Sequence, residues 1–161
     1  MEAAAAFLAV RPRSVAETRR RLRFLGYRHE LVDGVVERLA EMGYLDDEAF
    51  ARAWLDSRDR ARPRGAAALR RELALKGVDR TLVDGLLAER DDGSGADVES
   101  AGRLLERKRA QLEREPDLRK RRQKAYTLLA RSGFDPESIR SALAVVVDPS
   151  ARDVEVDLED R

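Results

Sequence analysis

The chain has 161 residues, of which 39% are charged and only 5% aromatic, and it contains no cysteine. This length suits one ordinary domain or a short array of small units, and the composition argues against a thick β-sandwich or a large enzyme pocket. The absence of cysteine excludes disulfides, thiolate catalysis and sulfur-ligated metals. The start MEAAAAFLAVRPRS lacks a basic region before its short apolar run, so we expect a cytoplasmic protein without a membrane segment.

The formal net charge of +1 conceals an uneven distribution of charge. Residues 1–28 hold seven basic and two acidic side chains, and residues 103–131 hold eleven and four. Residues 148–161 hold six acidic and two basic side chains. Basic surfaces are therefore expected on a nearly neutral protein.

Apolar residues recur with helical spacing along the whole chain, and only the short stretch DVEVDLED near the end alternates as a strand would. Helices are predicted over residues 2–9, 15–25, 30–42, 47–60, 66–76, 80–90, 97–114, 118–132 and 136–147. Ser14, Asp46 and Asp135 have the chemistry of helix N-caps. Gly26, Gly43, Gly77 and Gly133 each precede an apolar residue, which predicts four similar C-terminal stops.

A long internal repeat relates Arg11–Glu37 to Arg62–Ala88, with twelve identities in twenty-seven ungapped positions. A looser third copy aligns Leu129, Gly133 and Ile139 with Leu73, Gly77 and Leu82. The repeat predicts an all-α fold, an elongated and curved tandem array of three three-helix repeats. The expected boundaries are 1–43, 44–90 and 97–147 for the repeats, 91–96 for a flexible linker, and 148–161 for an acidic, disordered tail.

Candidate catalytic and metal-binding groups have simpler structural explanations. Asp46 and Asp47 stand at a helix start, where capping explains them better than a metal site. His29, the single histidine, falls in a turn between helices without a triad partner. RPRGAAALRRE lacks the second glycine and the lysine of a phosphate-binding loop, and Trp54 with Phe50 indicates a core stripe rather than a base-stacking platform. We expect no cofactor, no metal and no enzymatic activity.

Basic residues recur at equivalent places in the three repeats. Each basic residue alone is explained as solvated surface. Their recurrence at helix starts favours a binding surface for a polyanion or an acidic protein, and the sequence does not distinguish these two partners. Arg70 and Lys76 have the alternative of pairing with Glu72 or Asp79. The candidate contact residues are Arg13, Arg62, Arg64, Arg70, Arg71, Lys76, Arg119, Lys120, Arg121, Arg122 and Lys124.

The middle repeat resembles the RecX family of recombinase regulators. The resemblance rests on G-Y-L-D-D-x-x-F-A-x-x-W/Y-x-x-x-R over Gly43–Arg58, followed by R-P-R-G and by R-x-E-L-x-x-K-G-V over Arg70–Val78. It extends over about residues 5–147, including S-x-x-E/T-x-R-x-x-L-x-x-x-G in the first repeat.

This resemblance implies a non-enzymatic modulator of the RecA recombinase in DNA repair, homologous recombination and the SOS response. Family members are similar three-helix arrays that lie along the RecA–single-stranded DNA filament, inhibit ATP hydrolysis and strand exchange, and limit filament growth. The implied partners are RecA and its filament, with direct DNA contact, and the protein is expected to be a monomer. The alternative hypothesis is a stand-alone helical nucleic-acid-binding repeat protein, with the helix pairs around Gly26 and Gly77 as crude helix-turn-helix elements.

Overall fold

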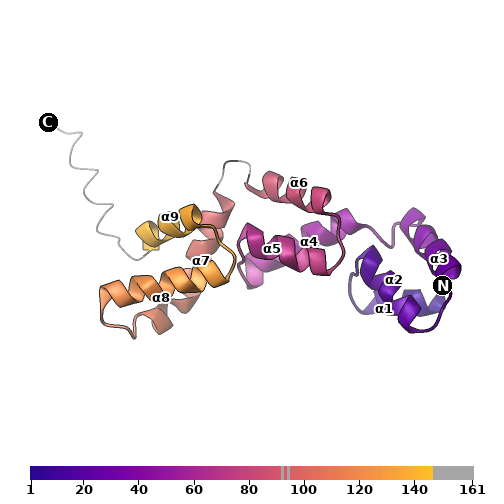
Figure 1. Cartoon of the computed structure of the whole chain (residues 1–161), viewed down its shortest axis with the longest axis horizontal. Helices are drawn as coiled ribbons and strands as arrows, with labels where there is room; N and C mark the ends of the chain where they lie inside the picture. Colours follow the sequence, from indigo (N-terminus) through magenta and orange to yellow (C-terminus); the bar gives the residue numbers. More distant parts are fainter. Residues whose placement is uncertain (92, 94, 147–161) are drawn as a thin grey trace. The chain divides into compact units, whose positions relative to one another are not determined.

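The computed structural model of the chain describes residues 1–91, 93 and 95–146. Within those residues all regular secondary structure is helical (Figure 1). Its elements are α1 (Glu2–Val10), α2 (Val15–Phe24), α3 (His29–Glu41), α4 (Asp47–Ala61), α5 (Ala66–Leu75), α6 (Arg80–Asp91), α7 (Ala96–Leu112), α8 (Leu118–Arg131) and α9 (Pro136–Val146). Each predicted helix ends within two residues of an observed boundary, so the all-α prediction is confirmed.

The predicted N-caps are confirmed by their hydrogen bonds. Ser14 forms a capping box with Glu17, in which the Ser14 hydroxyl accepts from the Glu17 amide at 3.1 Å. Asp46 accepts from the Ala49 amide at 2.9 Å. Asp135 accepts from the amides of Glu137 and Ser138 at the start of α9. These caps satisfy amides that have no partner inside their helices, and they fix where α2, α4 and α9 begin.

Four helices end in the same Schellman geometry at the predicted glycines. Gly26, Gly43, Gly77 and Gly133 all have φ between 74° and 87°. At each stop the glycine amide and the next amide donate back into the last turn, as in Gly77 to Ala74 and Val78 to Leu73. The left-handed backbone explains why glycine recurs at these four positions.

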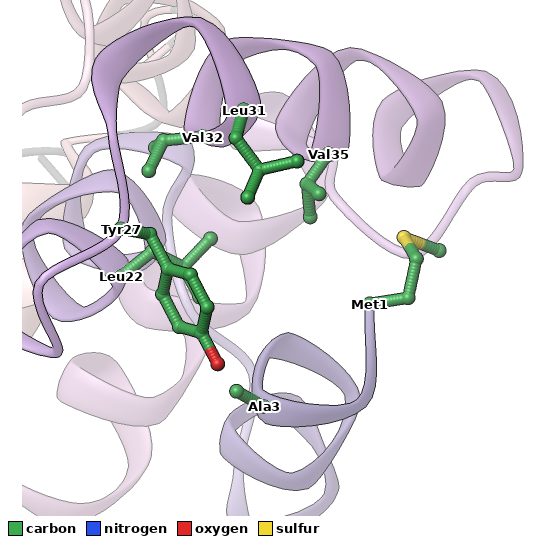
Figure 2. Close-up of a pocket in the computed structure, with 7 residues that line it drawn as sticks. All are labelled: Met1, Ala3, Leu22, Tyr27, Leu31, Val32 and Val35. Atoms are coloured by element: carbon green, nitrogen blue, oxygen red, sulfur yellow. The ribbon is translucent and has the colours of Figure 1, made fainter.

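The apolar residues after these glycines differ in burial. Val78 and Phe134 are buried, whereas Tyr27 and Tyr44 are exposed. Tyr27 instead lines a small apolar pocket together with Leu22, Leu31 and Ala3 (Figure 2). Figure 2 shows its ring crossing the pocket, with the hydroxyl directed toward α1. The pocket is formed by α1, α2 and α3 and has no charged side chain in its lining.

The chain divides into two compact units. The first unit comprises Met1–Asp56 and Arg70–Leu86, and the second comprises Ser57–Leu69 and the chain from Leu87 onward. In the first unit α1, α2 and α3 enclose a core of Ala4, Leu22, Val32, Val36, Leu39 and Leu45. In the second unit α7, α8 and α9 pack together around Ala101, Leu105, Ala125, Leu129, Phe134, Ile139, Ala142 and Leu143 (Figure 1).

The predicted linker and tail fall partly or wholly outside the described residues. Asp91 is the last residue of α6 and Ala96 the first of α7, while residues 92 and 94 of the predicted linker are not described. The predicted acidic tail, 148–161, lies outside the described residues altogether. No helix in the described part of the chain combines the length and apolar character needed to cross a bilayer.

Candidate functional site

The first unit contains a junction between the start of α2, the start of α4 and the end of α5. The Asp47 carboxylate accepts a hydrogen bond from the Val15 amide at 2.8 Å. The buried Ser14 hydroxyl donates to the Lys76 carbonyl at 2.5 Å. A Cβ at Gly77 would lie 2.4 Å from the Ala16 Cβ, so the α5 stop and α2 meet without space for a side chain. We call these contacts the first junction.

Polar side chains and one aromatic ring fill the space beside the first junction. The Trp54 indole donates to Glu72 at 2.9 Å, and the Lys76 ammonium lies 5.1 Å from the centre of the same ring. Lys76 also pairs with Glu17 at 2.9 Å. Burial disfavours the charged form of Glu17, but the Lys76 hydrogen bond and the Ser14 amide outweigh this and lower the Glu17 pKa.

The second unit contains an equivalent junction between the start of α5, the start of α7 and the end of α8. The Asp97 carboxylate accepts from the Ala66 amide at 2.9 Å, as Asp47 does from Val15. The Gly65 amide donates to the Ser132 carbonyl at 3.1 Å. A Cβ at Gly65 would approach the Gly133 carbonyl oxygen to 2.3 Å, so the two backbones pack directly. We call these contacts the second junction.

A buried charge network stabilises the second junction. Arg90 is 10% exposed and binds Asp59 at 2.8 Å and Asp97 at 2.6 Å, and it also donates to Ser100. Although burial opposes it, hydrogen bonding to the two carboxylates raises the Arg90 pKa above its ordinary value. Burial likewise opposes ionisation of Asp59, but Arg90 and Ser100 outweigh it and lower the Asp59 pKa. All these charges are compensated inside the fold.

An open groove, which we call the junction groove, lies beside the second junction. Its apolar residues are Ala61, Pro63, Leu104 and Leu128, and the buried Ser132 also lines it. The shared Asp cap and Schellman glycine align Leu104 with Trp54, Leu128 with Glu72, and Ser132 with Lys76. The three side chains that fill the space at the first junction are thus replaced by smaller or apolar ones, which leaves a hollow.

Four cations line the junction groove, namely Arg62, Arg64, Arg107 and Lys108. Arg107 donates to the carbonyls of Arg60 and Ala61 and so caps the end of α4. Arg62 and Lys108 are exposed, and their side chains have no ion-pair partner within the described ranges. The groove lining includes no carboxylate among the residues that the structure describes. Arg62 and Lys108 therefore present positive charge without an ion-pair partner in the described chain, over an apolar floor.

A second basic hollow, the α8–α9 groove, lies elsewhere on the same unit. Its cations are Arg119, Arg122 and Arg140, and its other residues are Leu118, Gln123, Tyr126 and Leu143. Leu118 is 61% exposed and Tyr126 is 37% exposed. Cations beside an exposed aromatic ring can contact the phosphates and bases of a single strand. The two grooves share no lining residue.

The predicted contact residues are divided among several environments. Arg62 and Arg64 line the junction groove, and Arg119 and Arg122 line the α8–α9 groove. Lys120 is exposed on α8. Arg121 and Lys124 both bind Glu115, through its carbonyl and its carboxylate respectively.

The other four predicted contact residues, Arg13, Arg70, Arg71 and Lys76, belong to the first unit. Arg71 is exposed, and the Arg13 guanidinium lies 4.1 Å from the centre of the Phe7 ring. Arg70 pairs with Asp84 at 2.7 Å and Lys76 with Glu17, so neither uses the predicted alternative partners Glu72 and Asp79 in these ion pairs.

Local geometry shows the surroundings of the acidic, aromatic and histidine residues discussed above. Asp46 caps α4, and Asp47 caps the neighbouring helix α2. Phe50 is buried as predicted, Trp54 is half-buried, and His29 is the exposed first residue of α3 rather than a turn residue. Within the described ranges no group of three acidic or histidine side chains could hold a metal ion.

Arg107, Lys108 and Arg140 are groove residues that the sequence analysis missed. Arg107 and Lys108 lie in the middle of a long helix, where a basic pair resembles ordinary solvated surface. The alignment of Asp97 with Asp47 provides the missing signal. It places Leu104 at the position equivalent to Trp54 and identifies the next turn of α7 as a wall of the junction groove. Helix geometry then brings Arg107 and Lys108 to the same side as Leu104.

The fold and these grooves define a tandem helical repeat protein with basic surface grooves. Family models for the first, second and third three-helix domains of RecX match residues 1–39, 46–87 and 96–143. The chain is 38% identical over 148 residues to the Regulatory protein RecX of Pelodictyon phaeoclathratiforme, covering 92% of this chain and 89% of that protein. It is 36% identical to the protein of the same name from Prosthecochloris aestuarii, covering 85% and 86%. The chain belongs to the RecX family.

Solved structures agree with this fold. A crystal structure of RecX from Lactobacillus salivarius superposes with a TM-score of 0.77 over 90% of this chain and 92% of that chain, at 19% identity. A second crystal structure, of a regulatory protein RecX, superposes with a TM-score of 0.73 over 88% of this chain and 70% of that chain. The three-helix repeat architecture is therefore shared although few residues are identical.

Proposed function

We propose that this chain is a non-enzymatic regulator that binds the RecA recombinase and its single-stranded DNA filament in the cytoplasm. In this proposal it inhibits ATP hydrolysis and strand exchange and limits filament growth. Family membership supports the regulatory role, because the curated relatives are named regulatory proteins. The observation that carries the binding proposal is the junction groove, with its four cations and no lining carboxylate among the described residues.

The junction groove is suited to an acidic protein segment or to phosphates. Arg62 and Lys108 offer cationic groups without internal partners in the described chain, while Arg107 is anchored on the end of α4. The anchored Arg107 can make one rigid contact with a partner, and the exposed Arg62 and Lys108 can adapt to it. Leu104 and Leu128 add apolar area, which favours a protein segment over a bare phosphate backbone.

DNA-dependent ATP hydrolysis by preformed RecA filaments tests the proposal. The wild-type chain should inhibit hydrolysis at concentrations well below that of RecA. The double variant Arg62→Glu, Lys108→Glu should need at least about tenfold more protein, since each reversal places a like charge at the contact. Inhibition only at concentrations that coat the DNA would overturn the proposal.

A matched control uses Arg23→Glu together with Arg28→Glu. Both residues are exposed, lie outside the two grooves, and give the same change in net charge. The control variant should inhibit within about twofold of the wild type. Equal losses in both double variants would show that net charge alone, not the junction groove, determines inhibition.

The α8–α9 groove favours a second candidate function, direct binding of single-stranded nucleic acid. Tyr126 lies among Arg119, Arg122 and Arg140, the combination that stacking and phosphate contact require. Arg119→Glu with Arg140→Glu should weaken binding to an oligonucleotide and flatten its salt dependence, because each lost phosphate contact removes roughly 0.7 from the slope. If RecA inhibition persists in this variant while DNA binding is lost, the two activities use separate grooves.

A further inference from the structure

The end of the chain has a pattern that complements the junction groove. Residues 153–160 read DVEVDLED, so carboxylates alternate with Val154, Val156 and Leu158. An extended backbone directs successive side chains to opposite sides. Such a segment would present three apolar side chains and Asp160 on one side, and the other four carboxylates on the opposite side.

The junction groove offers the matching chemistry. Its floor is apolar, at Pro63, Leu104 and Leu128, and four cations line it. The α8–α9 groove has three cations and is the weaker electrostatic match for a segment with five carboxylates. Because Arg62 and Lys108 have no ion-pair partner in the described chain, an incoming carboxylate would not have to displace one.

The acidic segment follows α9, a helix that begins close to the junction groove in sequence. Ser132 lines the groove, and α9 begins at Pro136, only four residues later. The eleven residues of α9 span about 16 Å, at 1.5 Å each. Residues 147–152 can span up to about 20 Å, at roughly 3.3 Å each, which exceeds the length of α9.

We propose that residues 153–160 of this chain dock in the junction groove and compete there with the partner. The docking itself follows from the groove and the acidic segment, whereas its inhibitory consequence rests on the proposed function. A tethered competitor acts at millimolar effective concentration, so even a weak contact would occupy the groove in the free protein. A partner with a higher affinity or a longer acidic surface would displace it.

A spin label placed at the chain end tests the docking directly. The chain contains no cysteine, so Arg161→Cys gives a single attachment site in the full-length protein. In a ¹⁵N-labelled sample, a nitroxide there should broaden the amide signals of Arg62, Leu104, Arg107 and Lys108. Broadening should fall at least about threefold in 0.5 M salt, because the Debye length shortens to a few ångströms.

Three variants make the test specific. Neutralising the acids (D153N, E155Q, D157N, E159Q and D160N) should abolish the broadening, and so should Arg62→Glu with Lys108→Glu. The control Arg119→Glu with Arg140→Glu changes the same amount of charge in the α8–α9 groove and should leave the broadening unchanged.

Several results would overturn the docking. These are broadening centred on Arg119 and Tyr126, broadening spread evenly over the second unit, or no broadening. Broadening in a mixture of spin-labelled ¹⁴N protein and unlabelled ¹⁵N protein would show docking on a second copy instead, and would also overturn the proposal.

The ATPase assay separates this inference from the proposed function. The acid-neutralised variant should inhibit RecA at about three- to tenfold lower concentration than the wild type if the segment competes. Docking without any RecA inhibition by either protein would contradict the proposed function and leave the docking intact. RecA inhibition that is identical in both proteins, with no broadening, would contradict the docking alone.

Discussion

Asp47 accepts a hydrogen bond of 2.8 Å from the backbone amide of Val15. A carboxylate on α4 thus satisfies an amide in the first turn of α2 that has no acceptor within its own helix. Burial raises the pKa of Asp47 above its ordinary value of 3.8, and the nearby Asp46 and Glu17 carboxylates add to this, although the Val15 amide and Arg19 oppose it. Folding therefore favours the protonated form of Asp47, and its ionisation lowers stability as pH rises through the folded-state pKa.

Asp47→Asn and Asp47→Ala should distinguish the contribution of the hydrogen-bond acceptor to stability from that of the negative charge. Asn keeps an oxygen for the Val15 amide and removes the costly ionisation, so it should change the free energy of unfolding by less than about 0.5 kcal/mol. Ala leaves the amide without a protein acceptor and should cost about 1–2 kcal/mol. Urea denaturation at pH 7 measures both, and equal losses would contradict the acceptor role.

Arg90→Leu should destabilise the protein by about 3 kcal/mol at pH 7, because Asp59 and Asp97 lose their shared cation in a partly buried site. In the wild type the Asp59 pKa lies below its ordinary value of 3.8, so its stabilising contribution is present above that value and is lost as pH falls through the folded-state pKa. Without Arg90, burial raises the Asp59 pKa instead. The variant should then gain stability as pH falls toward the ordinary Asp59 pKa of 3.8, where the wild type does not.

Arg103→Leu is the control for this experiment. Arg103 lies 3.8 Å from the same Asp59 carboxylate but is 44% exposed. Its removal should cost less than about 0.5 kcal/mol and leave the pH dependence of unfolding unchanged. Matching pH profiles for the Arg90 and Arg103 variants would show that Arg90 does not control the ionisation of Asp59.

Gly77→Ala and Gly43→Ala test the close packing at the first junction. Both glycines have φ near 75°, so both substitutions carry a similar backbone strain of about 1 kcal/mol. A Cβ at Gly43 meets nothing within 4 Å, whereas one at Gly77 would lie 2.4 Å from the Ala16 Cβ. Gly77→Ala should therefore cost about 1–3 kcal/mol more than Gly43→Ala in thermal or urea unfolding. Equal losses of stability in the two variants would mean that α2 and Gly77 can move apart to accommodate the added methyl group without further cost.

The helices could be predicted from sequence because their signals are local. The capping box of Ser14 with Glu17 lies within four residues, and Gly26, Gly43, Gly77 and Gly133 each end a helix through contacts in the last turn. Such signals do not depend on the partner that a helix later packs against. The same locality explains why His29 was misplaced by one residue only, since helix ends vary by that amount.

The junctions could not be predicted in the same way. Ser14 and Lys76 are sixty-two residues apart, and Asp59 and Arg90 are thirty-one apart, in a chain where 39% of residues are charged. Each acid had many equivalent basic partners in the sequence, so only the packing selects one. Lys76 was predicted as a partner contact, with an ion pair to Glu72 or Asp79 as the alternative. The structure pairs it with Glu17 beside Trp54, and its contact with a partner stays a prediction.

Lys76→Met tests whether Lys76 contributes to the stability of the fold rather than to contact with a partner. Met retains an apolar stem against Trp54 but removes the cation from Glu17, which is 11% exposed. Without that hydrogen bond, burial raises the Glu17 pKa, so stability should fall by about 1 kcal/mol at pH 7 and recover as pH falls toward 4.5.

The fluorescence of Trp54, the single tryptophan, should change in this variant because its ring loses the nearby ammonium. Arg71→Met, at an exposed position of α5 five residues before Lys76, should leave both stability and fluorescence unchanged. At a temperature where both variants are folded, Lys76→Met should inhibit RecA as the wild type does. A loss of inhibition without a loss of stability would instead place Lys76 at the partner surface, since a residue acting only through the fold cannot change binding while stability is preserved.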